Sequence, residues 1–401
     1  MRMDYSFETE VLEQVRRKIA HLEFVDDEQA RELIAETIFS NIFHIKMSDE
    51  ELKFIADRTF YRIRKPMGIL TPLIEDKKVT EIMVNGSEKI FIEREGLIRR
   101  LPYGFASVTE LEELMQRIAS GVHREINELH PIVDARLEDG SRVNGVYKNI
   151  AANGPILTIR KFSDNYMKLE DLVQNGTINE EADKLLRTLV MSGFNIFVSG
   201  GTSSGKTTLL NALGHCIPED ERVIVIEDSM ELQLNSVENL VQMECRQDNL
   251  SGIGKISIAQ LIRTSLRMRP DRIIVGEVRG EEVLDMLQAM NTGHAGSMST
   301  GHGNSIKGML RRLEAMFLMA MPLDIDAVRA QIAEGIDIMI HIEKYNRGRR
   351  ITEIIELVGY ENGRFILNPI MTLNEDEELT FTGNSIVNSY KLKRKGIDIF
   401  D

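Results

Sequence analysis

The chain has 401 residues, and its 49 lysines and arginines against 63 aspartates and glutamates give a net charge of −14. This acidic balance argues against a protein that coats nucleic acid, because such a protein needs a basic face to displace counterions. With only two cysteines, the chain can form neither a disulfide framework nor a four-cysteine zinc site. The N-terminus lacks an apolar signal sequence, and no apolar run approaches the ~20 residues that span a bilayer, so we expect a cytoplasmic protein.

Helical patterns occupy residues 1–60. Apolar residues recur at helical spacing, for example at Val11 and Val15. Ser48 is followed three residues later by Glu51, a capping box that predicts the start of a further helix. The segment is either a small structural bundle or an interaction module, and both interpretations stay open.

Residues 61–162 change to a mixed pattern that predicts an α+β domain. Alternating apolar residues at 81–84 and 89–93 indicate a hairpin, and the capping box of Ser107 and Glu110 predicts a helix. Further strands are expected at 132–137, 141–146 and 156–162.

The polar stretch 163–179 predicts a linker. Beyond it, strands alternate with helices through 180–370, which predicts an α/β core with a parallel sheet. The last segment, 371–401, is poor in apolar residues and contains a run of four acids and a cluster of basic residues. Such charge blocks resist burial, so we expect a mobile or peripheral charged tail.

A phosphate-binding motif opens the predicted core. Gly200 to Thr207 fits G-x-x-x-x-G-K-[ST], and an apolar strand precedes it while a helical pattern follows. In such a loop, backbone N–H groups and the helix N-terminus bind phosphate oxygens, the lysine faces the β and γ phosphates, and the hydroxyl of Thr207 serves Mg²⁺. The residues expected to bind the nucleotide here are Gly200, Gly201, Thr202, Ser203, Ser204, Gly205, Lys206, Thr207 and Thr208.

Two apolar strands of the predicted core end in acids, one at Glu227 and Asp228 and the other at Glu277. Ligands collect at the carboxyl ends of strands in open α/β sheets, so these acids should lie near the phosphates. Hydrolysis needs such an acid to position water. Gly276 stands where an aspartate usually holds Mg²⁺, so we expect Glu277 to act on the metal through water.

A glycine- and hydroxyl-rich segment at 291–305 carries His294 and His302. Two histidines without a nearby cysteine are too few ligands for a zinc site. An imidazole can donate to a phosphate, so the segment is either a sensor of the γ-phosphate or an ordinary structural element, with a metal pair as a third reading.

With the P-loop, Ile226–Asp228, Val275–Glu277 and the two-histidine segment in this order, the chain resembles the secretion superfamily of ATPases, and its CpaF (tight-adherence pilus) branch in particular. The resemblance covers residues 60–370, and its supporting stretches are RVIVIEDSMELQL (222–234) and LRMRPDRIIVGEVRGEEVLDMLQAMNTGHAGSMST (266–300). It implies a RecA-like P-loop core with a parallel sheet, preceded by an α+β (PAS-like) domain and the helical segment.

The resemblance also implies roles for single residues. Glu227 matches the catalytic glutamate, Glu277 the Walker B glutamate, and His294 and His302 the histidine box, in which His302 senses phosphate. Around His302, Gly301 and Gly303 replace the Leu and Ala that are more common in relatives, and we expect them to loosen the backbone there.

Arginines complete the implied site. In the family, arginines of the N-terminal domain reach the phosphates, and the matching positions are Arg136, Arg142 and Arg160, of which Arg142 is expected to act in catalysis. Arg279 matches a family arginine beside the nucleotide. Two further arginines near the same strand resemble interface arginines of the family, Arg263 and Arg267.

Together these features predict an ATP hydrolase. The resemblance implies a hexameric Mg-ATP-hydrolysing motor that powers pilus assembly or protein secretion through an inner-membrane platform. ATP and Mg²⁺ are the expected cofactors, and other copies of the chain and membrane platform proteins are the expected partners. We expect neither zinc nor a direct nucleic-acid partner, and a peripheral position at the inner membrane. The alternatives are a RecA-like nucleic-acid-dependent motor and a non-catalytic ATP-dependent scaffold.

Overall fold

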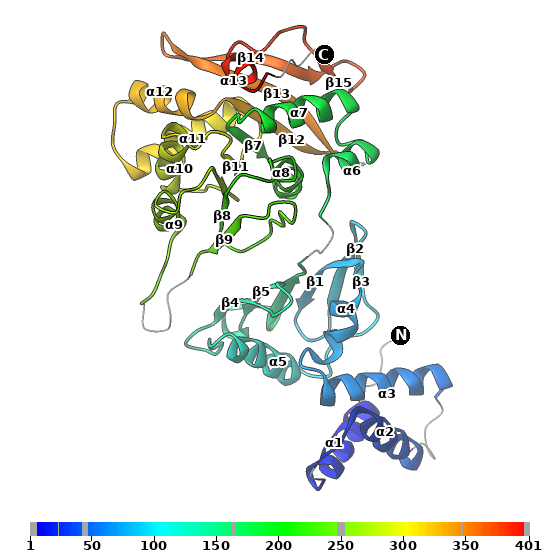
Figure 1. The fold of residues 1–401 in the computed structure, drawn as a ribbon. Helices are drawn as coiled ribbons and strands as arrows, with labels where there is room; N and C mark the ends of the chain where they lie inside the picture. The colour runs from blue at the N-terminus through cyan, green and yellow to red at the C-terminus, as the bar shows by residue number, and fades with distance from the viewer. Residues whose placement is uncertain are drawn as a thin grey trace. The chain divides into compact units, whose positions relative to one another are not determined.

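The computed structural model describes residues 6–22, 24–41, 47–162, 166–246, 253–345 and 348–396. It divides the chain into two compact units, unit 1 (Met1–Asp164) and unit 2 (Asn165–Asp401), which are described separately below (Figure 1). No helix among the described residues is both long and apolar enough to cross a membrane.

Three helices open unit 1: α1 (Ser6–Ala20), α2 (Asp27–Asn41) and α3 (Asp49–Arg64). The Ser48 hydroxyl caps α3 reciprocally with Glu51, as the capping box predicts. A cluster of buried charges joins α1 and α3 to α5 (Val108–Gly121): Glu8 lies 2.8 Å from Arg58 and 3.0 Å from Arg62, which lies 2.7 Å from Glu110. Because removing one partner of a buried ion pair is strongly destabilising, these contacts fix the helical segment to the rest of unit 1.

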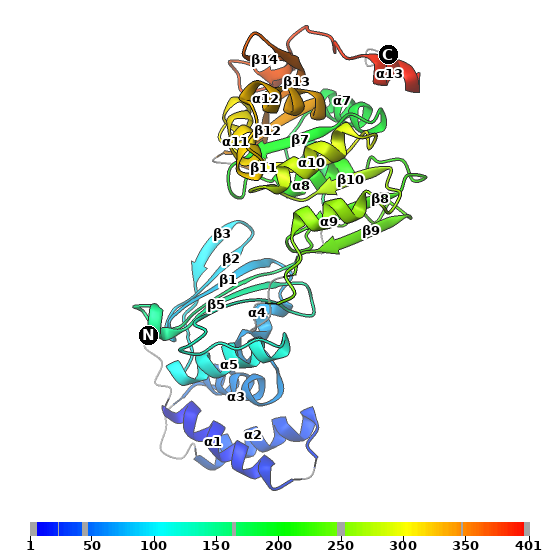
Figure 2. The ribbon, with the colours of Figure 1, turned by 90° about the vertical axis from the view of Figure 1, so that its left-hand side faces the viewer.

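The remainder of unit 1 is a six-stranded antiparallel sheet in the order β3-β2-β1-β6-β5-β4. Its elements are α4 (Thr71–Glu75), β1 (Val79–Asn85), β2 (Ile90–Arg94), β3 (Leu97–Arg100), β4 (Ile132–Arg136), β5 (Arg142–Val146) and β6 (Ile156–Arg160). Figure 2 shows α3 and α5 on the same side of this sheet. The expected strands and helix are present, and β3 is an additional strand. All four of its side chains are exposed, so it has no alternating pattern for a sequence to reveal.

Unit 2 contains a nine-stranded sheet in the order β15-β14-β13-β12-β7-β11-β10-β8-β9. The strands from β12 to β9 in this order run parallel, as predicted, while β12 to β15 pair antiparallel and extend the sheet beyond the expected fold. The strands are β7 (Ile196–Gly200), β8 (Val223–Glu227), β9 (Leu240–Glu244), β10 (Arg272–Val275), β11 (Met298–His302), β12 (Ile338–Tyr345), β13 (Gly348–Glu361), β14 (Arg364–Leu373) and β15 (Leu379–Phe381).

Helices cover both faces of the unit 2 sheet. One apolar core lies beneath α7 (Glu180–Met191) and α8 (Lys206–Gly214). A second core lies beneath four helices on the other face: α9 (Ile258–Ser265), α10 (Glu282–Asn291), α11 (Ile306–Ala320) and α12 (Ile325–Gly335). Every residue of β7 is buried, so the strand that leads into the P-loop is enclosed on both faces.

The linker is shorter than the predicted 163–179, because the second half of this stretch belongs to unit 2. Residues 169–174 form helix α6 (Leu169–Gln174), and Leu169, Leu172 and Ile178 are buried in the first core of unit 2. Three buried side chains among polar neighbours are enough to dock this segment, although they are too few to form a clear helical pattern.

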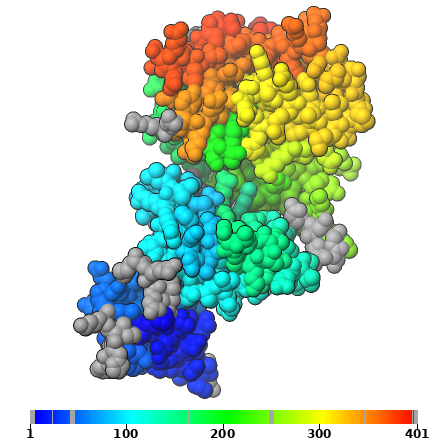
Figure 3. Space-filling view, turned by 180° about the vertical axis from the view of Figure 1, so that it is seen from behind, coloured from blue at the N-terminus to red at the C-terminus, as the bar shows by residue number. Residues whose placement is uncertain are grey.

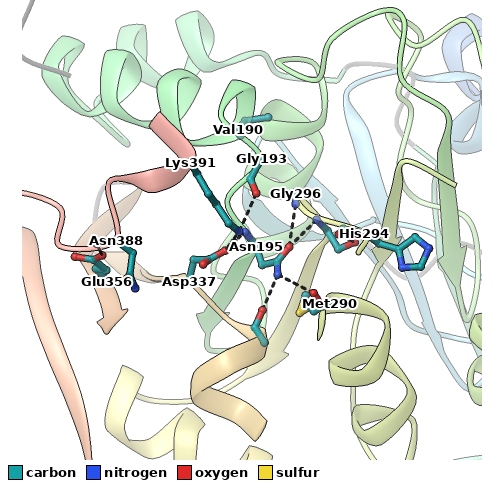
Figure 4. Close-up of polar contacts among 12 residues, drawn as sticks. Val190, Gly193, Asn195, Met290, His294, Gly296, Asp337, Glu356, Asn388 and Lys391 are labelled. Atoms are coloured by element: carbon teal, nitrogen blue, oxygen red, sulfur yellow. Dashed lines mark hydrogen bonds and ion pairs between the residues drawn. The ribbon is translucent and has the colours of Figure 1, made fainter. Parts of the chain in front are cut away.

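The described part of 371–401 lies at the edge of the unit 2 sheet, and its acidic run, 375–378, is exposed as predicted, but the segment is more than a charged tail. This part forms β15 and helix α13 (Tyr390–Lys395), and it buries Leu379, Ile386 and Leu392. Figure 4 shows Lys391 reaching Asp337, where Nζ lies 2.5 Å from a carboxylate oxygen. Charges that would resist burial alone are thus paired. In space-filling view, the C-terminal strands, coloured orange to red, form one side of unit 2 (Figure 3).

The Lys391 contact predicts a stability effect. Burial raises the pKa of Asp337, whose carboxylate also accepts a hydrogen bond of 2.6 Å from the backbone N–H of Asn195. Lys391→Met leaves this buried carboxylate without its cation and should lower the free energy of unfolding by about 1–3 kcal/mol, measured by urea denaturation. Lys393→Met removes an exposed lysine of the same helix and should change it little; equal effects of the two variants would contradict this role of Lys391.

Both cysteines should react slowly. Burial raises the pKa of Cys216 to about 11 and that of Cys245 to about 12. The thiolate is the reactive form, so at pH 8 a thiol-reactive dye should label the folded protein about 100-fold or more slowly than the urea-unfolded chain. Rapid labelling of both thiols in the folded protein would contradict the structure.

Candidate functional site

The predicted P-loop connects β7 to α8. Gly205 has a φ of 100° and Ser203 a φ of 57°, so the loop uses two left-handed residues in its turn. A Cβ at Gly200 would lie only 2.4 Å from the backbone oxygen of Ile342 in β12, so this position has room for glycine alone. Gly201 has open space around it, which explains why its identity varies within the motif.

Lys206 is 7% exposed and lies over the loop. Its ammonium is 3.2 Å from the oxygen of Gly200, 2.9 Å from that of Gly201 and 3.2 Å from Nδ1 of His302. Burial lowers the pKa of Lys206 from its ordinary value, and the nearby Glu277 carboxylate opposes that shift. The lysine is therefore an enclosed cation held by neutral acceptors.

His302 connects this lysine to the second acidic strand. Nε2 of His302 lies 2.7 Å from Oε1 of Glu277. Burial lowers the pKa of His302, with Glu277 opposing, and this favours a neutral imidazole at neutral pH. Lys206 can only donate, so Nδ1 is the accepting nitrogen and the ring proton lies on Nε2, the nitrogen nearer Glu277.

Arg279 extends the chain of contacts across the acids. It lies 2.8 Å from Glu277 and 3.4 Å from Asp228, so it joins the ends of β10 and β8. The structure thereby brings together residues from the ends of four neighbouring strands: Lys206, His302, Glu277, Arg279 and Asp228.

Glu227 ends β8 and is 4% exposed. Its carboxylate accepts hydrogen bonds from the backbone N–H groups of Glu231 at 3.1 Å and Leu232 at 3.2 Å, which fix its orientation. A Cβ at Gly276 would lie 2.8 Å from Cγ of Glu227. The departure at Gly276 therefore has a steric reason: an aspartate there would displace the glutamate.

A cavity of about 320 Å³ lies beside the P-loop. Seven residues line it: Gly201, Thr202, His302, Gly303, Asn304, Gly308 and Arg312. Arg312 on α11 is a residue that the sequence analysis missed, because it lies outside every recognised motif. Its guanidinium adds positive charge beside His302 and is among the groups that lower the pKa of this histidine.

The glycines around His302 do not loosen its backbone as expected. Gly301 and His302 are part of β11, and a Cβ at Gly301 would lie 2.8 Å from Met309 and 2.9 Å from Phe197. At Gly303 the nearest atom, in Met309, would lie 3.0 Å away. These glycines allow close packing of α11 and β7 against the strand that carries the histidine.

His294 requires a correction. It precedes β11, whose register with β7 runs from Met298 opposite Ile196 to His302 opposite Gly200. His294 therefore lies at the amino edge of this parallel sheet, whereas the P-loop follows the carboxyl edge. Its Nδ1 is 3.1 Å from the oxygen of Ala289, which is a structural contact away from the P-loop of its own unit.

The three predicted arginines of the N-terminal domain form one row in unit 1. Arg142 in β5 pairs in register with Arg136 in β4 on one side and with Arg160 in β6 on the other. Of the other arginines, Arg263 binds Asp285 at 2.7 Å and thereby joins α9 to α10, while Arg267 is exposed.

The donor set is compatible with Mg²⁺ bound together with a triphosphate. In the part of the chain that the structure describes, no group of three or more His, Cys, Asp or Glu could hold a metal alone. Mg²⁺ usually takes one or two protein oxygens and completes its shell with phosphates and waters. The hydroxyl of Thr207 and the carboxylate of Glu277 are suitable oxygens.

Comparisons with known proteins agree with this site. A family model described as type II/IV secretion system protein matches residues 64–344. The chain is 36% identical over 313 residues to a probable conjugal transfer protein, TrbB, of Sinorhizobium fredii, covering 76% of this chain and 91% of that one. It is 32% identical over 312 residues to the type IV secretion system protein PtlH of Bordetella pertussis, covering 71% and 92%.

Two solved structures share the fold. The pilus retraction motor PilT with bound ADP matches with a TM-score of 0.55 at 20% identity, over 81% of this chain and 85% of that one. The ATPase DotB of Legionella pneumophila matches with a TM-score of 0.52 at 21% identity, over 72% and 79%. At these identities the likeness shows the fold alone, and it agrees with the predicted RecA-like core. The matched family and the assembled P-loop together show that the chain belongs to the type II/IV secretion system protein family and is an ATPase of that class.

Proposed function

We propose that the protein is a hexameric motor that hydrolyses Mg-ATP to power pilus assembly or protein secretion through an inner-membrane platform. The observation that carries this proposal is the chain of contacts from Lys206 through His302 to Glu277. These contacts link the P-loop to the ends of β11 and β10, so a change at the phosphate would shift side chains on both strands.

In this mechanism Glu227 orients and deprotonates the attacking water, because its carboxylate is buried and held by two backbone N–H groups. Lys206 faces the β and γ phosphates. When Lys206 turns to the phosphates, Nδ1 of His302 takes up a proton and donates it in a hydrogen bond to a γ-phosphate oxygen, and the histidine thereby senses hydrolysis. When bound, Mg²⁺ neutralises phosphate charge; Thr207 would hold it directly, and Glu277 through water.

The arginine row of unit 1 supplies the remaining positive charge in the proposal. Arg136, Arg142 and Arg160 occupy directly opposite positions on three neighbouring strands, so their guanidinium groups can meet one anionic ligand. We assign Arg142, the middle residue, to the charge that develops during phosphoryl transfer. Binding and release of phosphates by this row would couple hydrolysis to movement of unit 1.

Within the family, we propose that the protein belongs to the CpaF (tight-adherence pilus) branch. We also propose that it works in the cytoplasm at the inner membrane. With a net charge of −14, the protein would meet basic cytoplasmic loops of a platform protein. The rival nucleic-acid motor predicts strong stimulation of ATP hydrolysis by single-stranded DNA, whereas our proposal predicts none.

The role of Glu227 can be tested by substitution. Glu227→Gln keeps the shape but removes the base, so kcat for ATP hydrolysis should fall by about 10²-fold or more while Mg-ATP still binds. Glu244→Gln changes the residue that pairs with Glu227 in the neighbouring strand β9 and should leave kcat within a few-fold. Full turnover by Glu227→Gln at saturating Mg-ATP would refute the assignment.

The steric role of Gly276 gives a second test. Gly276→Ala places a methyl group 2.8 Å from Cγ of Glu227 and should lower kcat about 10-fold to 100-fold by displacing the carboxylate. Gly359→Ala is the matched control, because a Cβ at Gly359 meets no atom within 4 Å. Unchanged turnover of Gly276→Ala would show that Glu227 tolerates this shift.

A further inference from the structure

The hairpin of β12 and β13 contacts the P-loop on the side away from the acids. Ile342 pairs in register with Gly200. A Cβ at Gly205 would lie 3.4 Å from Cδ1 of Ile342, 3.6 Å from Cγ of Arg349 and 3.9 Å from Cβ of Arg349. The aliphatic stem of Arg349 therefore packs against the glycine that immediately precedes α8.

A second cation lies directly opposite Arg349. Lys344 and Arg349 are register partners, and partners across an antiparallel pair project from the same face of the sheet. The neighbouring pair on this face, Ile342 and Ile351, is buried in the core beneath α8. Lys344 and Arg349 thus lie on the α8 face, where the loop binds phosphates.

Neither side chain is neutralised by the described parts of the protein. Lys344 and Arg349 are exposed, and within the ranges that the structure describes neither makes a hydrogen bond or an ion pair. By contrast, the adjacent Arg350 binds Glu377 at 3.3 Å. Because like charges directly opposite each other destabilise a strand pair, Lys344 and Arg349 favour an anion between or beside them.

The strand order tells which part of a nucleotide lies there. β12 and β11 flank β7 on opposite sides, and β10 and β8 follow β11. His302, Glu277 and Glu227 all lie on the β11 side, so the γ-phosphate faces that side. The remainder of the nucleotide extends across the loop toward β12. In the proposed function Lys206 faces the β and γ phosphates, so the anionic group that remains on the β12 side is the α-phosphate.

We propose that Arg349 and Lys344 bind the α-phosphate of the nucleotide. This inference rests on the proposed function and adds binding residues about 140 positions beyond the P-loop motif. The guanidinium supplies paired donors for phosphate oxygens, and the lysine adds a point charge. These contacts persist throughout the reaction at the γ-phosphate, so they contribute to binding and leave the chemical step unchanged.

The experiment measures the affinity of the full-length chain for two probes, Mg-ATP and Mg-tripolyphosphate, by isothermal titration calorimetry. Tripolyphosphate carries an equivalent of the α-phosphate but no nucleoside. Arg349→Ala should raise the Kd of both probes roughly 10-fold to 100-fold, and Lys344→Ala should raise it less. The KM for Mg-ATP should rise in the same order as the Kd.

Arg364→Ala is the control. It removes an exposed arginine at the turn between β13 and β14, which is the opposite end of β13 from Arg349, and both affinities should be unchanged. The thermal unfolding midpoint of Arg349→Ala should be unchanged or slightly higher, because a like-charge pair is removed.

Two results would overturn this inference and leave the proposed function intact. Unchanged affinity of Arg349→Ala for both probes shows that the arginine does not bind the nucleotide. Loss of affinity for Mg-ATP alone assigns it to the nucleoside and contradicts the α-phosphate contact. Failure of the unsubstituted protein to bind Mg-ATP is a different outcome, since it refutes the proposed function and this inference with it.

Discussion

An enclosed positive charge at the start of α8 determines most of the surrounding structure. The ammonium of Lys206 needs acceptors, and it finds two carbonyl oxygens of its own loop and a ring nitrogen of His302. The imidazole that accepts at Nδ1 carries its proton on Nε2, and this nitrogen lies 2.7 Å from Oε1 of Glu277. Arg279 in turn forms an ion pair with Glu277 and a second one with Asp228. One cation therefore dictates the residue types at the ends of three strands.

Glycines make this arrangement possible by leaving space for other residues. Gly200 lets the backbone of β12 approach β7, Gly276 leaves room for the side chain of Glu227, and Gly301 admits Phe197 and Met309. In each case the occupant comes from a different segment of the chain. The glycines are therefore conformationally ordinary but sterically required, and their reason lies in tertiary packing.

The parts of the site that are local in sequence were predictable. The strand, loop and helix around Lys206 form one continuous motif, and the apolar strands that end in Glu227 and Glu277 indicate by themselves where their acids lie. The prediction that His294 lies at the nucleotide was wrong because strand β11 separates this residue from His302. A strand advances about 3.3 Å per residue, so two histidines that are neighbours in a motif lie at opposite edges of the sheet.

The other parts of the fold and of the site depend on contacts between distant segments, which a single sequence does not reveal. The docking of α6 and of the C-terminal segment depends on a few apolar residues whose partners lie in other elements, and the charge of Lys391 is acceptable only beside Asp337. The antiparallel extension β13 to β15 and the face on which Lys344 and Arg349 meet follow from register, which a single sequence does not specify. The sequence did not reveal Arg312 for the same reason, since the cavity that it lines is assembled from a loop and a helix far apart in sequence.

The position of β7 between β11 and β12 has a consequence for biosynthesis. Its flanking strands lie about 100 and 140 residues further along the chain. During translation, the strand that leads into the P-loop therefore emerges long before either neighbour exists, with its backbone hydrogen-bonding groups unpaired. Such non-local pairing slows folding and exposes apolar strands to association. A ribosome that has made only the first 290 residues thus carries a complete phosphate-binding sequence that has no sheet neighbours to hold it in its native shape.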